Sequence, residues 1–103
     1  METMQGIDTI HRTIETQKTV LILAKTRTCS VCNVAESRLE PILAKHPHVA
    51  AYRVYIEDEE RFRGDALVFS VPTVIVYHEG REQLRESRFI NTTKIERLLE
   101  MVK

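Results

Sequence analysis

The stretch VLILAKTRTCSVC, residues 20–32, decides the fold, because an apolar run leads directly into two closely spaced cysteines. The continuous run Val20–Ala24 is typical of a strand that is buried on both faces. After Cys32, apolar side chains recur at helical spacing. Cys29 and Cys32, the only cysteines of the chain, therefore lie between a strand and the start of a helix. In that context a CxxC pair indicates redox chemistry.

A second informative stretch is Val71-Pro72-Thr73, which leads into another apolar run. A proline is tolerated at the first residue of a strand, where its missing N–H breaks no ladder hydrogen bond. A proline this far along the chain from the cysteines can bring its backbone into contact with them when the chain folds. Together, the two stretches indicate dithiol–disulfide exchange.

Length, charge and the N-terminal sequence narrow the class of protein. A chain of 103 residues is near the common size for one core, so we expect a single domain over residues 1–103. Fifteen basic residues balance fifteen acidic ones, which gives no reason to expect nucleic acid or an anionic membrane as a partner. No apolar run approaches the roughly 18–20 residues of a membrane span, and the N-terminus lacks a signal-peptide pattern. These features predict a cytoplasmic protein, in which a lone CxxC is not a structural staple.

The remaining periodicities predict alternating strands and helices. Helices are expected over 4–16, from the cysteines to about 45, briefly within 58–66, and from 93 onward; strands are expected over 18–25, 49–56, 73–77 and 82–89. Glu79-Gly80 is expected to form the turn of a hairpin, and Thr93-Lys94-Ile95-Glu96 fits a capping box. Strands that alternate with helices in the first part of the chain are expected to pair in parallel. The two strands of the closing hairpin are expected to pair antiparallel. The predicted fold class is therefore α/β, with a central mixed β-sheet flanked by helices.

This order of motifs resembles the thioredoxin family from Thr19 to Lys103, with the CxxC before a helix, Val71-Pro72-Thr73 before a strand, the hairpin and a terminal helix. The resemblance implies the thioredoxin fold with an extra N-terminal helix. It implies a cis peptide bond before Pro72, and a Val71 backbone that faces the cysteines and pairs with substrate. The implied activity is that of a thiol–disulfide oxidoreductase in cell redox homeostasis, acting on protein or small-molecule disulfides.

Four departures from the best-known members indicate a divergent protein. Thr28, which we expect at the substrate surface, stands where the family usually has tryptophan, and Ser30-Val31 replaces glycine-proline. Leu23 stands where thioredoxin proper has a buried aspartate. Asn91-Thr92 is assigned to the place where a glycine usually opens the substrate surface.

The two thiols are expected to divide the chemistry between them. The N-terminus of a helix stabilises a thiolate and lowers the pKa of a cysteine placed there. Cys29, at the open end, is the predicted nucleophile, and Cys32, one turn into the helix, is the predicted resolving thiol. No cofactor is expected beyond the redox-active Cys29–Cys32 disulfide. A reductase must recharge the pair, and a monomer is expected.

The sequence shows no evident base that could deprotonate Cys32, because Leu23 stands where thioredoxin proper has its buried aspartate. Glu57 or water could accept the proton, although spacing supports neither. Lys25 and Arg27 either add a cationic field or face solvent. Arg53 either approaches the site from its strand or lies exposed, and the exposed position is favoured.

Two other functions stay open. Thr28-Cys29-Ser30-Val31-Cys32 also resembles the copper-chaperone motif, and soft thiolates favour Cu(I). The chain could also be a thioredoxin-fold interaction module whose thiols are not turned over. A structural zinc site requires four ligands, and the chain has only two cysteines, so such a site is not expected. The four histidines are expected to be ordinary surface residues: His11, His46, His48 and His78.

Overall fold

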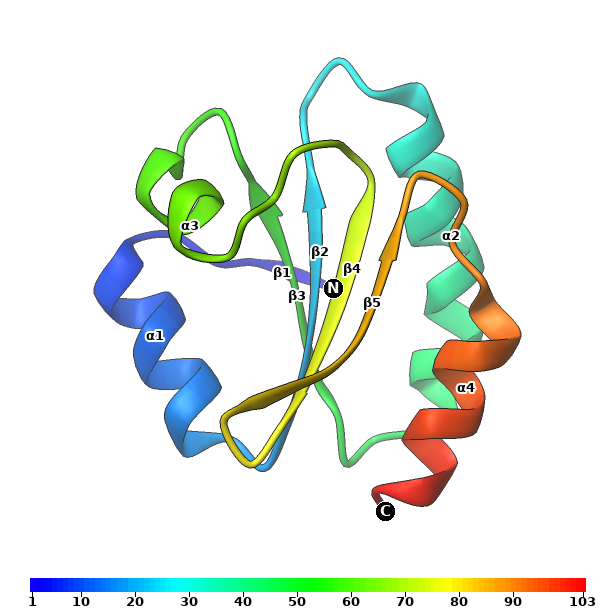
Figure 1. Ribbon diagram of the computed structural model, residues 1–103. Coiled ribbons are helices and arrows are strands. Elements are labelled where there is room, and N and C mark those ends of the chain that lie inside the picture. Colours follow the sequence, from blue (N-terminus) through cyan, green and yellow to red (C-terminus); the bar gives the residue numbers. More distant parts are fainter.

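Figure 1 shows the computed structural model, which describes residues 1–103 as a central sheet between two layers of helices. The elements are β1 (Glu2–Thr3), α1 (Ile7–Thr16), β2 (Thr19–Lys25), α2 (Ser30–Ala44), β3 (Ala50–Tyr55), α3 (Glu60–Asp65), β4 (Thr73–His78), β5 (Arg81–Ser87) and α4 (Thr92–Met101). None of the helices has both the length and the apolar character needed to cross a membrane.

The five-stranded sheet has the order β1-β3-β2-β4-β5, with β2 at its centre. β2 pairs in parallel with β3 and antiparallel with β4, while β4 and β5 form the closing hairpin. All seven residues of β2 are buried, because helices cover both of its faces. The α/β class and the mixed sheet predicted from the sequence are therefore confirmed.

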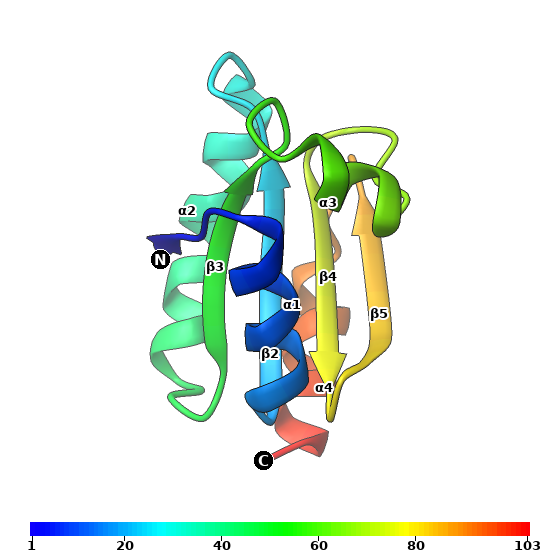
Figure 2. The same cartoon turned by 90° about the vertical axis from the view of Figure 1, so that its left-hand side faces the viewer.

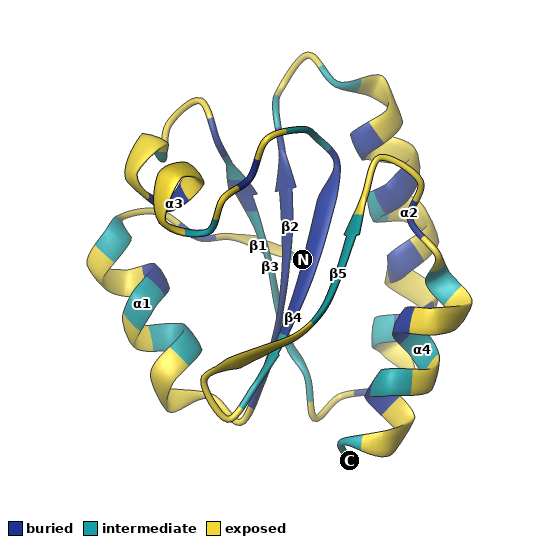
Figure 3. Cartoon of the chain, viewed as in Figure 1, coloured by how far each residue is buried: buried dark blue, intermediate teal, exposed yellow.

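Two hydrophobic clusters hold the layers together, one on each face of the sheet. α1 and α3 cover one face (Figure 2), where Ile10 and Phe62 belong to the same buried cluster as Ile22. α2 and α4 cover the other, where Leu39 and Leu99 are fully buried. Figure 3 shows this as buried residues on the helix sides that face the sheet and exposed residues on the outer sides. Successive side chains of β2 contribute to opposite clusters, as the period of a strand requires.

The N-terminal region differs from the prediction of one helix over 4–16. α1 begins at Ile7, after Gly6, whose φ of 89° lies in a region that glycine adopts at low cost. The preceding Glu2–Thr3 forms β1 and pairs in parallel with β3, and buried Met4 extends this pairing by donating its N–H to Arg53 O. A strand of two residues has too few side chains to show an alternating pattern, so the sequence did not indicate it.

The start of α4 also differs from the prediction. Asn91, and not Thr93, is the N-cap, because its Oδ1 accepts a hydrogen bond from Lys94 N at 3.0 Å. The helix therefore begins at Thr92. The edge strand β5 ends at Ser87, earlier than expected, because Arg88 has a φ of 66° and leaves the extended conformation. The turn at Glu79-Gly80, where both residues have positive φ, is as predicted.

An Asn91→Ala substitution is expected to destabilise the protein by about 1 kcal/mol, because it leaves the Lys94 N–H without its capping acceptor. Urea unfolding followed by circular dichroism measures this change. The matched control is Thr93→Ala, which removes the hydroxyl of the capping box that the sequence suggested. Thr93 lies inside the helix, so its substitution should change stability by less than about 0.5 kcal/mol. A larger loss for Thr93→Ala than for Asn91→Ala would contradict the assigned cap.

Candidate active site

The two cysteines form a disulfide at the start of α2, with their Cα atoms 5.3 Å apart. Cys29 is the N-cap residue and is partly exposed, whereas Cys32 lies one turn into the helix and is fully buried. A molecule approaching from solvent can therefore reach the sulfur of Cys29 more readily than that of Cys32.

The helix start supplies a hydrogen bond to the outer sulfur. Cys29 Sγ accepts from the backbone N–H of Cys32 at 3.1 Å, which is the position that a capping oxygen usually occupies. The first N–H groups of a helix lack intrahelical partners and carry partial positive charge. Negative charge on Cys29 Sγ after reduction would be stabilised by the same groups.

The Val71-Pro72-Thr73 segment brings another part of the chain to this end of the sheet. The Val71–Pro72 peptide bond is cis, the geometry that the resemblance implied. Pro72 is buried, and its carbonyl accepts from Arg88 N at 2.8 Å, which joins this segment to the loop between β5 and α4. Val71 makes no backbone hydrogen bond within the chain, so its N–H and C=O remain available to an extended segment. Thr28 lies exposed just before Cys29.

A buried charge cluster of Lys25, Glu36 and Arg53 lies between the sheet and α2. Lys25 Nζ donates to Glu36 Oε1 at 3.0 Å, and Arg53 donates to both carboxylate oxygens, at 3.2 and 2.6 Å. The Lys25 side chain is 6% exposed and the Glu36 side chain 16%. These contacts, led by the hydrogen bonds from Arg53, lower the pKa of Glu36 from 4.5 to about 2. Glu36 is therefore ionised throughout the physiological range.

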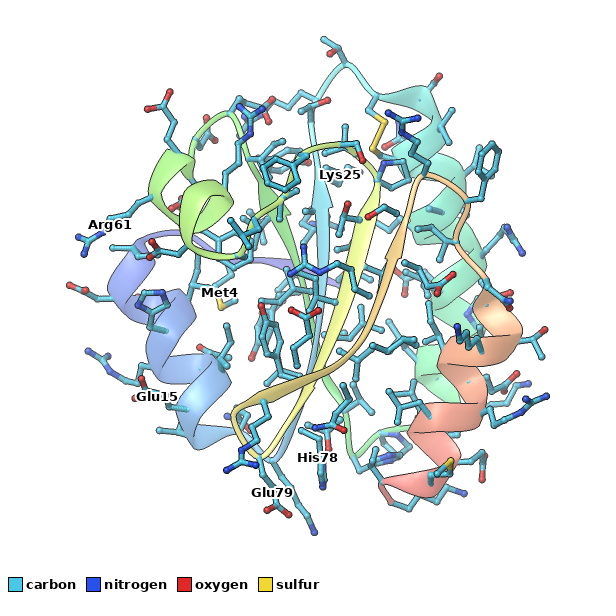
Figure 4. All side chains as sticks on the ribbon, viewed as in Figure 1. Met4, Glu15, Lys25, Arg61, His78 and Glu79 are labelled. Carbon is cyan, nitrogen blue, oxygen red and sulfur yellow. A yellow bond between two sulfur atoms is a disulfide. The ribbon has the colours of Figure 1, made fainter.

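This cluster lies within one helical turn of Cys32. Lys25 Nζ also donates to Asn33 Oδ1 at 2.8 Å, and Asn33 directly follows Cys32 in the helix. Glu36 is four residues after Cys32, so the two side chains are neighbours on one face, with Cβ atoms about 5–6 Å apart. Figure 4 shows Lys25 at the same end of the sheet as the disulfide. The cluster carries two positive charges and one negative charge.

The sequence reasoning missed most of this cluster. Lys25 is buried, which excludes the alternative that it faces solvent, and the favoured exposed position of Arg53 is wrong. A signal was present, because Lys25 continues the alternation of Leu21 and Leu23 toward α2. Leu23 itself is fully buried, so no carboxylate occupies that position.

Glu57 and Arg27 contact each other at the rim of the site. Glu57 accepts from Arg27 N at 3.0 Å, and this hydrogen bond is the main cause that lowers the pKa of Glu57. The guanidinium of Arg27 lies 4.1 Å from the Tyr55 ring centroid and pairs with Asp58. No contact connects Glu57 to the buried Cys32, so the structure gives no support to Glu57 as its proton acceptor.

Arg88 occupies the glycine-like backbone position beside the site. Its φ of 66° is in the left-handed region, and its N–H contacts Pro72. Asn91 has a φ of −81° and caps α4. Arg88, and not Asn91, therefore has the left-handed backbone that favours glycine. The position of the family's glycine at Asn91-Thr92 stays a prediction.

The expectation that all four histidines lie on the surface is wrong for His46. Its side chain is fully buried, 3.4 Å from Glu100 and 3.8 Å from Glu96, and neither ring nitrogen has a hydrogen-bond partner. His46 follows the C-terminus of α2, far from the cysteines along that helix. Nowhere in the chain do three or more metal-ligating side chains of His, Cys, Asp or Glu come together.

Comparison with known proteins places this site in a familiar fold. No established family model matches the sequence. The thioredoxin-like protein YdfQ of Bacillus subtilis is 26% identical over 102 residues, covering 99% of this chain and 91% of that protein. The X-ray structure of Fasciola hepatica thioredoxin superposes with a TM-score of 0.86 at 19% identity, covering 100% of both chains. Mitochondrial thioredoxin 3 of Saccharomyces cerevisiae, in its oxidized form, gives 0.85 at 14% identity, covering 98% of this chain and 94% of that one.

These likenesses agree with the geometry of the site. The structural neighbours establish the fold. The sequence similarity to the thioredoxin-like protein YdfQ extends over nearly the whole chain. The disulfide joins the two cysteines of a CxxC motif at the start of a helix, a position that lowers the pKa of a cysteine. The chain has the thioredoxin fold, with a disulfide-bonded CxxC pair at the start of α2, and its sequence is similar over nearly its whole length to a thioredoxin-like protein.

Proposed function

We propose that the protein is a thiol–disulfide oxidoreductase that reduces disulfides of client proteins in the cytoplasm. The observation that carries this proposal is the asymmetry of the pair, with Cys29 partly exposed at the helix N-cap and Cys32 fully buried. In the proposed cycle, the Cys29 thiolate attacks a client sulfur, and one client thiolate leaves. Cys32 then loses its proton, attacks Cys29 Sγ and releases the second client thiol. A reductase returns two electrons to the Cys29–Cys32 disulfide, so no other cofactor is needed.

The backbone of Val71 supports binding of a client in this cycle. Its unpaired N–H and C=O lie beside Pro72, at the end of the sheet that carries the disulfide. An extended segment can add to such a backbone as a strand, so that main-chain hydrogen bonds hold many different client sequences. Thr28 would contact the same segment from the loop before Cys29.

The buried charge cluster is proposed to favour ionisation of Cys32. Lys25 is faced by Glu36 from α2 and by Arg53 and the Tyr55 ring from β3, and the net charge of these groups is positive. A positive charge in a poorly solvated region stabilises a nearby thiolate. In this mechanism Lys25 is a positioning residue, and the proton itself goes to water.

A Lys25→Met substitution is expected to raise the pH midpoint of Cys32 alkylation by about one pH unit, because a nearby positive charge that stabilises the thiolate is lost. The measurement uses the Cys29→Ser background, in which Cys32 is the only thiol. Lys45→Met is the matched control, because Lys45 caps the far end of α2 and pairs with Glu96 on the surface. Glu36→Gln should lower the midpoint. Shifts of the same sign for Lys25→Met and Glu36→Gln would contradict the electrostatic role.

The proposed function is tested by two measurements on the purified protein. Equilibration with a glutathione redox buffer, followed by thiol alkylation and mass measurement, should reveal a reversible Cys29–Cys32 disulfide with a potential below the cytosolic poise of about −220 to −320 mV. The protein should also accelerate reduction of insulin by dithiothreitol. A reversible disulfide without any acceleration would favour an interaction module. Failure to form the disulfide, together with stoichiometric Cu(I) binding, would favour the copper-binding alternative.

A further inference from the structure

An apolar groove lies between α2 and the loop that joins β5 to α4, at the end of α2 that carries the disulfide. Figure 1 shows this loop beside α2. Its volume is about 460 Å³. Val31, which lies between the two cysteines, and Val34 line it from the helix, and Phe89 lines it from the loop. These side chains are 58%, 59% and 89% exposed, respectively, although each is large and apolar. Such a cluster beside a reactive sulfur indicates a surface that another molecule covers.

Two arginines give the groove a positive rim. Arg38 belongs to α2 and donates only to Thr92 Oγ1, at 3.2 Å, while Arg88 has no ion pair. The single acidic residue of the groove, Glu86, is already engaged, because it accepts from Asn91 N at 3.3 Å and lies 3.9 Å from Lys94 Nζ. Both guanidinium groups are therefore available to an external carboxylate, for which arginine provides paired donors.

We propose that this groove selects clients in which an apolar residue next to the reacting cysteine is followed, further along the chain, by a carboxylate. The inference rests on the proposed function and names its substrate preference. Phe89, Val31 and Val34 receive the apolar side chain, and Arg38 and Arg88 receive the acidic one. Specificity of this kind resides in side chains and adds to the sequence-independent pairing with the Val71 backbone.

The spacing of the acidic residue follows from the helix. Arg38 is seven residues after Val31, which corresponds to about 10 Å along α2. An extended segment advances about 3.3 Å per residue, so it reaches Arg38 about three residues from its cysteine. Arg88, whose backbone contacts Pro72, lies nearer to the disulfide end. A carboxylate three residues from the cysteine therefore lies at Arg38, and Arg88 adds positive charge from the disulfide end of the groove.

The test uses synthetic peptides acetyl-Xaa-Ala-Leu-Cys-Leu-Ala-Xaa-amide, in which both Xaa are Glu, Gln or Lys and the cysteine forms a disulfide with thionitrobenzoate. The symmetric design covers either chain direction. The Cys29 thiolate attacks the peptide sulfur and displaces the coloured thionitrobenzoate thiolate. Cys32, after losing its proton to buffer, then attacks Cys29 Sγ and releases the peptide thiol. Two electrons pass from the protein dithiol to the peptide disulfide, and the coloured anion reports the first step.

With the reduced wild-type protein at about 20 mM salt, the Glu peptide is expected to react about tenfold faster than the Lys peptide, with Gln between them. At about 500 mM salt the ratio should fall below about threefold, because exposed charges are screened. Arg38→Glu combined with Arg88→Glu should reverse the order. A further Glu peptide with Ala in place of both Leu residues should react more slowly with the wild-type protein, and Phe89→Ala should remove this difference. Phe89 is almost fully exposed, so this substitution does not disturb the core.

Arg61→Glu provides the matched control, because it changes the net charge in the same direction on the far side of the sheet (Figure 4). This variant should keep the wild-type order of peptides. Equal rates for the three peptides, or an order that Arg61→Glu alters as much as the groove variant does, would overturn the inference and leave the proposed function intact. If every peptide reacted no faster with the protein than with free N-acetylcysteine, the proposed function would fail as well.

Discussion

A Cys29→Ser variant is expected to lose at least about three orders of magnitude in the rate of insulin reduction, because a serine hydroxyl is not ionised at neutral pH and cannot carry the exchange. Cys29 provides the sulfur that solvent reaches and that accepts the Cys32 N–H at 3.1 Å. The fold should survive, since the side chain lies at the helix start and serine is a favoured N-cap residue. Equal far-ultraviolet circular dichroism and equal urea midpoints of the reduced proteins would establish that the loss is chemical.

A Cys32→Ser variant is expected to behave differently, because it retains the attacking thiolate and lacks the resolving one. It should accumulate mixed disulfides between Cys29 and client proteins, visible on non-reducing gels and abolished by dithiothreitol. The buried position of Cys32 explains why it acts within the chain and not on clients. Recovery of more mixed disulfides with Cys29→Ser than with Cys32→Ser would reverse the two roles.

The sequence predicted the central elements because their signals are local and strong. β2 is a continuous aliphatic run and α2 has a clear helical period, and the two lie on either side of the CxxC pair. The Val71-Pro72-Thr73 stretch predicted, through the family resemblance, the cis peptide bond before Pro72, and Thr73 pairs with Ala24 at the end of β2 that leads to the cysteines. The errors fell at element ends, as with β1 and the Asn91 cap, where one or two backbone hydrogen bonds decide the boundary.

The charged residues around the site were harder to predict, because their roles depend on contacts between distant segments. Lys25, Glu36 and Arg53 come from β2, α2 and β3, and charged residues are almost never fully buried unless they are paired. Without the pairing, a solvent-exposed position is the reasonable expectation for each of them. His46 was mistaken for a surface residue for the same reason, since the segment that covers it is α4, at the other end of the sequence.

A Glu36→Ala variant is expected to lose about 3 kcal/mol of folding stability, because it leaves the buried Lys25 ammonium without its carboxylate. The lowering of the Glu36 pKa from 4.5 to about 2 corresponds to a similar free energy of about 3 kcal/mol. Urea unfolding of the reduced protein at neutral pH measures the change. Glu82→Ala is the matched control, because Glu82 makes a comparable two-oxygen contact with Arg85 on the surface. That pair should contribute less than about 1 kcal/mol.

The dependence of stability on pH offers a second measurement of the same interaction. Because pairing lowers the folded-state pKa of Glu36 below its ordinary value of 4.5, the stabilisation is fully present above about pH 5 and is lost as the pH falls toward 2. The wild-type protein should therefore lose stability more steeply across this window than Glu36→Ala does. Parallel curves for the two proteins would show that the carboxylate contributes nothing through its charge.

Replacing Lys25 and Glu36 together by leucine should restore most of the lost stability, because a buried ion pair often contributes no more to stability than apolar residues of similar size. Arg53 is 23% exposed and can turn toward solvent when its partner is removed. The Cys32 alkylation midpoint of the same double variant should move less than that of Lys25→Met, because the loss of the positive charge of Lys25 and the loss of the negative charge of Glu36 act in opposite directions. Recovered stability would show that the fold does not require the buried ion pair. A midpoint raised as far as in Lys25→Met would contradict the opposing effect assigned to Glu36.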